Sequence, residues 1–196
     1  MTPTHNDADR AEEDVVALLK RQHEEIKHLF AQVEAASGDE RRAAFDGLVR
    51  LLAVHETAEE EVVHPAAKKT VPNGDQVVAE RLEEEREAKE VLSRLDGMNP
   101  DDPQFLPQLI SLRDAVVAHA EAEEQFEFEA LRTRTDPEKL ARMARAVKAA
   151  EATAPTHPHP GVESRAKNMA FGPIAAVVDR TRDAVRQSMG GRDDRR

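Results

Sequence analysis

Apolar residues recur every three or four positions in four successive stretches of the chain, the spacing that gathers them on one face of an α-helix. Turn residues separate the stretches: Ser37-Gly38, then Val71–Gly74, then the proline-containing Gly97–Pro103. The expected helices cover residues of about 9–36, 39–68, 75–97 and 104–132. The sequence has no sustained alternation of apolar and polar residues, which would indicate strands. The pattern therefore predicts an all-α, up-down-up-down four-helix bundle.

The same spacing predicts which side chains face the core and where helices begin. Leu82 in the third stretch and Phe126 in the fourth lie on the apolar stripes, so both are expected inside. Asp75 follows a Pro-Asn-Gly turn and is expected to cap the third helix.

The chain continues beyond the bundle with a less regular extension. Pro137 is expected in the first turn of a fifth helix that ends near residue 152. The proline-rich run 154–161 must be extended, and a last amphipathic helix covers about 172–190. We thus expect a flexible tail (1–12), the bundle (13–133), a helix–loop–helix extension (134–190) and a second tail (191–196).

Ionisable residues interrupt the apolar stripes near the middle of every bundle helix. Burying an unpaired carboxylate costs several kcal/mol, roughly, so such residues need a partner. In an antiparallel hairpin, residues at one height are equidistant from the turn. That rule puts these side chains in a single layer, namely His23, His55, Glu59, Glu85, His119 and Glu123.

The charge of this layer points to metal ions. Three carboxylates and three neutral imidazoles carry about −3, which two divalent or trivalent cations would balance. The motif His-x-x-x-Glu, whose ends lie on one helix face, occurs at His55–Glu59 and again 64 residues later at His119–Glu123. Histidine and carboxylate ligands without thiolate suit iron or manganese, and zinc is the further alternative. A single such motif is usually a solvated ion pair, and Glu85 could instead pair with Arg81 or Lys89.

The other histidines are weaker ligand candidates. His28 lies off the stripe and is expected at the surface. His64 is half a helical circumference from His55, so it could reach the layer only if the helix distorts at Pro65, and would otherwise support a ligand or end the helix. His5, His157 and His159 lie in segments expected to be irregular, where exposure or packing is the simpler interpretation.

Composition narrows the classes of function. The formal net charge of −11 disfavours binding to nucleic acid. The absence of cysteine excludes disulfides, thiolate metal sites and cysteine nucleophiles. There is no apolar run long enough for a membrane span and no signal-like start, so we expect a cytoplasmic protein without a membrane partner.

The sequence resembles the hemerythrin-like (HHE, cation-binding) family, especially bacterial and actinobacterial members. The stretches that carry the resemblance span about 14–132 and are LLKRQHEEIKHLF, LLAVHETAEEEVVHPA, ERLEEEREAKEVLSRL and AVVAHAEAEEQFEFEAL. It implies a left-handed bundle around a non-haem di-iron centre, bridged by two carboxylates and a solvent-derived oxygen. Carried over, His23, His55 and His119 would be terminal ligands, with Glu59 and Glu123 as bridges.

The third helix departs from the family pattern. Glu85 stands where many relatives have histidine in a stretch similar to EEHxEAK. Anionic oxygen ligands stabilise ferric iron, so reversible oxygen carriage becomes less favourable. We therefore expect reaction with a small oxidant, namely hydrogen peroxide, dioxygen or nitric oxide, in a catalase- or peroxidase-like or oxidative-stress role, with no catalytic residues apart from the ligands. The alternatives are an oxygen- or iron-binding or redox-sensing module without turnover, and a structural bundle with a zinc or salt-bridged core.

Overall fold

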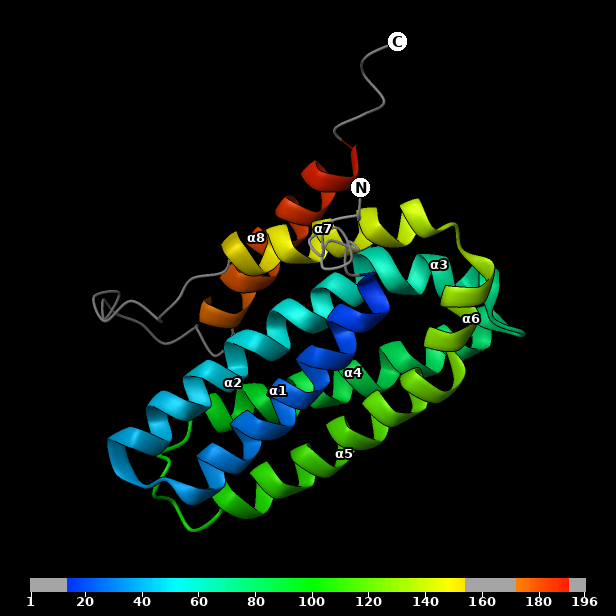
Figure 1. Cartoon of the computed structure of the whole chain (residues 1–196). Coiled ribbons are helices and arrows are strands. Elements are labelled where there is room, and N and C mark those ends of the chain that lie inside the picture. The colour runs from blue at the N-terminus through cyan, green and yellow to red at the C-terminus, as the bar shows by residue number, and fades with distance from the viewer. Residues whose placement is uncertain (1–13, 154–171, 191–196) are drawn as a thin grey trace, which may run out of the picture.

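The computed structural model describes residues 14–153 and 172–190, which form helices and turns without any strand. The first bundle helix is α1 (Val15–Ala35), and the second consists of α2 (Gly38–Ala58), a π-helical turn η2 (Glu59–Val63) and α3 (His64–Thr70). The third is α4 (Gly74–Asp96), and the fourth consists of α5 (Phe105–Phe126) and α6 (Phe128–Arg134). Figure 1 shows these helices side by side, as expected for a four-helix bundle.

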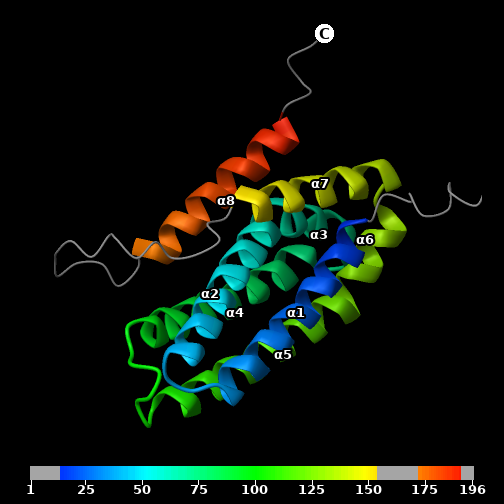
Figure 2. The same cartoon turned by 60° about the vertical axis from the view of Figure 1, so that its left-hand side comes forward.

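Two further helices belong to the extension, α7 (Pro137–Thr153) and α8 (Gly172–Gly190). Both pack against the bundle near the η2–α3 end, where α7 contacts α1 and α8 contacts α2 (Figures 1 and 2). Their buried side chains share one apolar cluster with α1, α2 and α6, including Val147 and Val185 with Leu19 and Phe128. The extension is thus part of the hydrophobic core at that end.

A second apolar cluster fills the opposite end of the bundle, around Phe30, Phe45 and Phe105. Along α1 the two clusters meet at His23, with Leu19 in one and Ile26 in the other. The predicted polar layer therefore lies between two hydrophobic cores, which exclude water from above and below it.

The helix ends follow local chemistry. The carboxylate of Asp14 accepts a hydrogen bond from the backbone N–H of Ala17 at 2.7 Å and begins α1, whereas the expected start near residue 9 lies outside the described residues. The expected cap at Asp75 is wrong. Asn73, with a φ of 54°, precedes α4, and Gly74 packs so closely on α3 that a Cβ there would lie 2.5 Å from the carbonyl oxygen of Lys68.

Two expected core residues face solvent instead. Phe126 is 57% exposed because the helix breaks at Glu127, between α5 and α6, and Phe128 takes the inward position. Leu82 is also exposed, while its neighbour Arg81 turns inward towards Glu127. No helix in the described segments has both the length and the apolarity needed to cross a membrane.

Candidate metal centre

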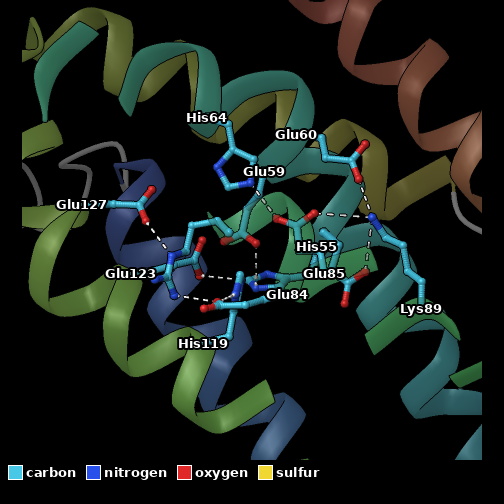
Figure 3. A network of polar contacts seen from close by, with 12 residues as sticks. His55, Glu59, Glu60, His64, Glu84, Glu85, Lys89, His119, Glu123 and Glu127 are labelled. Carbon is cyan, nitrogen blue, oxygen red and sulfur yellow. Dashed lines mark hydrogen bonds and ion pairs between the residues drawn. The ribbon is translucent and has the colours of Figure 1, made fainter. Parts of the chain in front are cut away.

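The structure brings all six sequence-predicted residues into one layer at the middle of the bundle. Five of them are buried and the side chain of His119 is 11% exposed. The Nε2 atom of His55 lies 3.3 Å from an oxygen of Glu59, and those of His23 and His119 each lie 3.5 Å from an oxygen of Glu123. These side chains come from α1, α2, η2, α4 and α5, and Figure 3 shows those from α2, η2, α4 and α5 converging.

An outer ring of acceptors orients the three imidazoles. The Nδ1 atom of His23 contacts Glu124 at 2.9 Å, and that of His119 contacts Glu84 at 2.8 Å. The Nδ1 atom of His55 contacts the amide oxygen of Gln22 at 2.8 Å. Because carboxylates and amide oxygens accept, each Nδ1 carries the proton and each Nε2 turns its lone pair inward. This is the arrangement that metal-binding histidines adopt.

Two groups of donor atoms are close enough to share a cation. His23, His55, Glu59 and Glu123 form the first, and Glu59, Glu85 and His119 form the second, each with all of its donor atoms within 4.8 Å of one another. Glu59 belongs to both groups. The resulting geometry offers two adjacent positions joined by a carboxylate.

The inward atoms of the layer lack hydrogen-bond partners. Among the described residues, no group forms a hydrogen bond with the Nε2 atoms of His23 and His119 or with either oxygen of Glu59 and Glu123. Buried polar atoms are normally satisfied, and leaving one unpaired costs about 1–3 kcal/mol. A metal ion would satisfy all of these atoms together, so the donor set fits the group that the sequence implied.

The pKa shifts of two residues in the layer also favour a bound cation. Burial, followed by the charges of Glu123 and Glu85, raises the pKa of Glu59 well above its ordinary value. Burial and the neighbouring imidazoles hold the pKa of His55 well below its ordinary value. Without a cation, Glu59 therefore favours its protonated form and His55 its neutral form.

A third donor group, which the sequence did not single out as a unit, consists of His64, Glu123 and Glu127. The sequence feature that could have predicted Glu127 is its four-residue spacing from Glu123, which continues the His119–Glu123 stripe. Burial and the charge of Glu123 raise the pKa of Glu127 to about 7, and Arg81 lies 3.6 Å from its carboxylate. A cation is thus already beside this group, which makes it a weaker metal position than the other two.

The helix distortion required for His64 to approach the layer is present as η2. The ring of Pro65 clashes with a regular helical carbonyl four residues earlier and offers no N–H. The N–H of His64 instead bonds the carbonyl of Glu59, five residues back, and the widened turn carries the His64 side chain inward. Its Nε2 atom lies 2.6 Å from Glu85. Burial lowers the pKa of His64, but its hydrogen bond to Glu85 and the charge of that carboxylate outweigh burial and raise it.

Glu85 has both a buried position and a charged partner. Lys89 lies 3.4 Å from its second oxygen, whereas Arg81 pairs with Glu84 and Glu127 instead. Lys89 also contacts Glu56 and Glu60. Burial dominates in raising the pKa of Glu56 to about 8, despite the opposing charge of Lys89. The pairing with Lys89 that the sequence offered thus exists inside the molecule, beside the second donor group.

A cavity of about 430 Å³ ends on the layer. All four bundle helices contribute to its wall, mainly through α4 and α5, and His23, His55, Glu85 and His119 line it. Much of the remaining wall is apolar and includes Leu52, Ala88, Val91, Leu112 and Val116. A small molecule can therefore approach ligand candidates of both donor groups.

The remaining histidines lie elsewhere. His28 is exposed and contacts Gln32, as expected for a surface residue. His5, His157 and His159 lie outside the described residues.

The chain matches one protein-family model, and two known proteins are similar to it over most of its length. The family model "Hemerythrin HHE cation binding domain" matches residues 14–131. A DNA nickase from Nostoc is 26% identical over 145 residues, covering 74% of this chain but 41% of that protein, so the chain spans about two fifths of this relative. A hemerythrin-like protein from Schizosaccharomyces pombe is 25% identical over 168 residues, covering 84% of this chain and 83% of that protein.

Among solved structures, an HHE cation-binding domain-containing protein from Mycobacterium kansasii matches with a TM-score of 0.62 at 24% identity. The match covers 71% of this chain and 86% of that chain. It supports the helical-bundle fold.

Proposed function

The chain belongs to the hemerythrin HHE cation-binding family, and from this premise we propose that its buried layer holds two iron ions that react with a small oxidant. The observation that carries the proposal is the pair of adjacent donor groups that share Glu59 at the inner end of a cavity. Histidine and carboxylate ligands favour iron over softer alternatives, with manganese and zinc as competitors.

The residues divide into two sets of ligands. His23 and His55 would hold one ion, and His119 with Glu85 would hold the other, and all four side chains line the cavity. Glu59 would contact both ions, and we assign the same role to Glu123 because its carboxylate lies equally close to His23 and His119. Bound iron would supply the electrons for breaking an O–O bond and the charge that balances the carboxylates.

We propose hydrogen peroxide as the oxidant and disproportionation as the reaction. Two molecules of peroxide give two of water and one of dioxygen, so the reaction needs no external reductant. The cavity admits a molecule of this size, and Glu84 and Glu124 keep the imidazoles oriented during reaction. A nucleic-acid substrate is disfavoured because the chain has a net charge of −11.

The second candidate function is redox sensing without turnover, and a chain of ion pairs favours it. Lys89 joins Glu85 to Glu60, and Arg182 of α8 lies 3.6 Å from Glu60 and 2.8 Å from Glu61. A change of charge at the centre would thereby reach the C-terminal helix.

Oxygen evolution distinguishes these functions. Protein loaded anaerobically with iron and then supplied with hydrogen peroxide should release dioxygen over many turnovers. His119→Gln should abolish release, whereas His28→Gln, at the surface, should not change it. Protein that retains two irons but releases no dioxygen would contradict the enzymatic proposal and leave the sensing function.

A further inference from the structure

The three inward-facing histidines differ in what holds them. His23 and His119 each contact a carboxylate through Nδ1, whereas His55 contacts the neutral amide of Gln22. A carboxylate can only accept a hydrogen bond, so it fixes the histidine tautomer without help. An amide can present either its oxygen or its NH₂ group, so the side chain of Gln22 must itself be oriented.

Glu151, on α7 of the C-terminal extension, provides that orientation. The Nε2 atom of Gln22 donates to the carboxylate of Glu151 at 2.5 Å, across 129 residues of sequence. Gln22 is buried, and its oxygen lies 2.8 Å from the Nδ1 atom of His55. The two contacts of Gln22 therefore connect the extension to the metal centre.

The direction of each hydrogen bond follows from Glu151. Because an ionised carboxylate has no proton to donate, the NH₂ group of Gln22 must face Glu151. The amide oxygen of Gln22 must then face His55, and the Nδ1 atom of His55 must carry the proton. The Nε2 atom is left with its lone pair directed at Glu59, 3.3 Å away.

We propose that Glu151 is a positioning residue of the metal centre, which sets the tautomer of His55 through the amide of Gln22. The inference rests on the proposed role of His55 as a ligand. It gives the extension a chemical role, because the acceptor that fixes the orientation of Gln22 comes from α7. Without Glu151 the amide can turn over and offer its NH₂ group to Nδ1, which would place the proton on Nε2, where it blocks metal binding.

Exchanging the two residues provides the test. Glu151→Gln removes the obligate acceptor, and Gln22→Glu places two carboxylates in contact. The double variant Gln22→Glu/Glu151→Gln rebuilds the network in reverse, since the new carboxylate accepts from both His55 and the new amide. Glu138→Gln, an exposed position on the same helix, is the matched control.

Two readouts on the full chain are needed. The first is affinity for Fe²⁺, measured anaerobically in competition with a chelator. The second is the ¹⁵N signature of the His55 tautomer in Zn²⁺-loaded and metal-free protein. Glu151→Gln should lose affinity roughly tenfold, the size expected when an outer hydrogen-bond partner of a ligand is lost. Gln22→Glu should keep the proton of His55 on Nδ1, because a carboxylate at this position can only accept. The double variant and Glu138→Gln should remain near wild type, with the proton of His55 on Nδ1.

Several results would overturn the inference. One is unchanged affinity and tautomer in Glu151→Gln; another is a folded double variant that recovers neither property. If a single variant fails to fold, the double variant alone decides the matter. If wild-type protein binds no metal, the proposed function fails, and the tautomer in metal-free protein still tests the link between Glu151 and His55.

Discussion

The two helices that carry a histidine–glutamate pair have equivalent breaks but different surroundings. In one, α2 ends at Ala58 and the π-helical turn η2, which begins at Glu59, leads into α3. In the other, α5 ends at Phe126 and the single residue Glu127 separates it from α6. Both continuations have seven residues and begin 64 residues apart, the same offset as the two motifs. The repeat thus includes the distortions as well as the ligand candidates.

The two halves of the site, one around His55 and Glu59 and the other around His119 and Glu123, differ in their surroundings. Helices α7 and α8 cover the half that contains His55, whose side chain is 4% exposed and whose outer partner Gln22 is buried. Both His55 and His119 line the cavity, but the side chain of His119 is 11% exposed and its outer partner Glu84 is also exposed to solvent. From this comparison we infer that the ion position at His55 is more enclosed and more firmly held, and that the position at His119 is more open to reactants.

Removing the shared carboxylates should have the largest effect, because it affects both halves at once. Glu59→Ala and Glu123→Ala should each lose both ions, since each removes a carboxylate at the junction of the two positions. Elemental analysis of the purified variants measures this loss. Glu121→Ala, an exposed position on α5, is the control and should keep both ions. Full metal content in Glu59→Ala would contradict the shared position.

Metal removal should destabilise the protein, and more so at pH 8 than at pH 5. The pKa of Glu127 is raised to about 7 and that of Glu59 also lies well above its ordinary value. A raised pKa in the folded state stabilises the metal-free protein below about pH 4.5, and that contribution is lost as pH rises through the raised value. Chelation should lower the melting temperature by about 10 °C at pH 8, for an ion present at roughly a thousand times its Kd.

Calorimetry with and without chelator, at both pH values, measures this difference. An equal effect of chelation at pH 5 and pH 8 would show that metal does not replace protons in the layer.

Single histidine substitutions should show different effects on the two ion positions. His119→Gln should lose peroxide turnover and the more weakly held ion, while keeping the ion at His23 and His55. His55→Gln should instead release the firmly held ion, with an affinity loss larger than the roughly tenfold expected for an outer partner. Stepwise release of iron to a chelator, followed optically, distinguishes the two. Identical release curves would mean that the halves are equivalent.

Glu85→His should produce a smaller change, confined to the open half. Replacing an anionic ligand by a neutral one should raise the reduction potential of the centre and leave two irons bound. Redox titration monitored by the visible spectrum measures the shift. Lys89→Met serves as the control for the ion pair: if it shifts the potential as much as Glu85→His, Glu85 acts only through Lys89.

Much of this architecture follows from periodicity. The resemblance to the hemerythrin family and the all-α bundle are confirmed, and among the described residues helices lie over the predicted stretches, because amphipathic stripes and turn residues leave little freedom in such a chain. The layer can be found from sequence because charged residues on an apolar stripe are conspicuous, and antiparallel geometry fixes their height.

The features that the sequence left open, such as the position of His64, or that sequence reasoning missed depend on departures from regular helix and on distant packing. The turn η2 and the break at Glu127 shift the helical register, which turns His64 and Phe128 inward and Phe126 outward. The contact of Gln22 with Glu151 depends on where α7 docks. No spacing rule links residues so far apart, since the docking is set by apolar packing against α1.

The most direct test of the two-ion centre is elemental analysis, with a visible spectrum, of protein purified without added metal. The chain has no Trp or Tyr, so metal-free protein scarcely absorbs at 280 nm and ferric absorption is easily seen. We predict about two irons per chain and a near-ultraviolet absorption that chelation removes. A single metal ion per chain, no metal after growth with iron, or a colourless iron-loaded protein would contradict the two-ion centre.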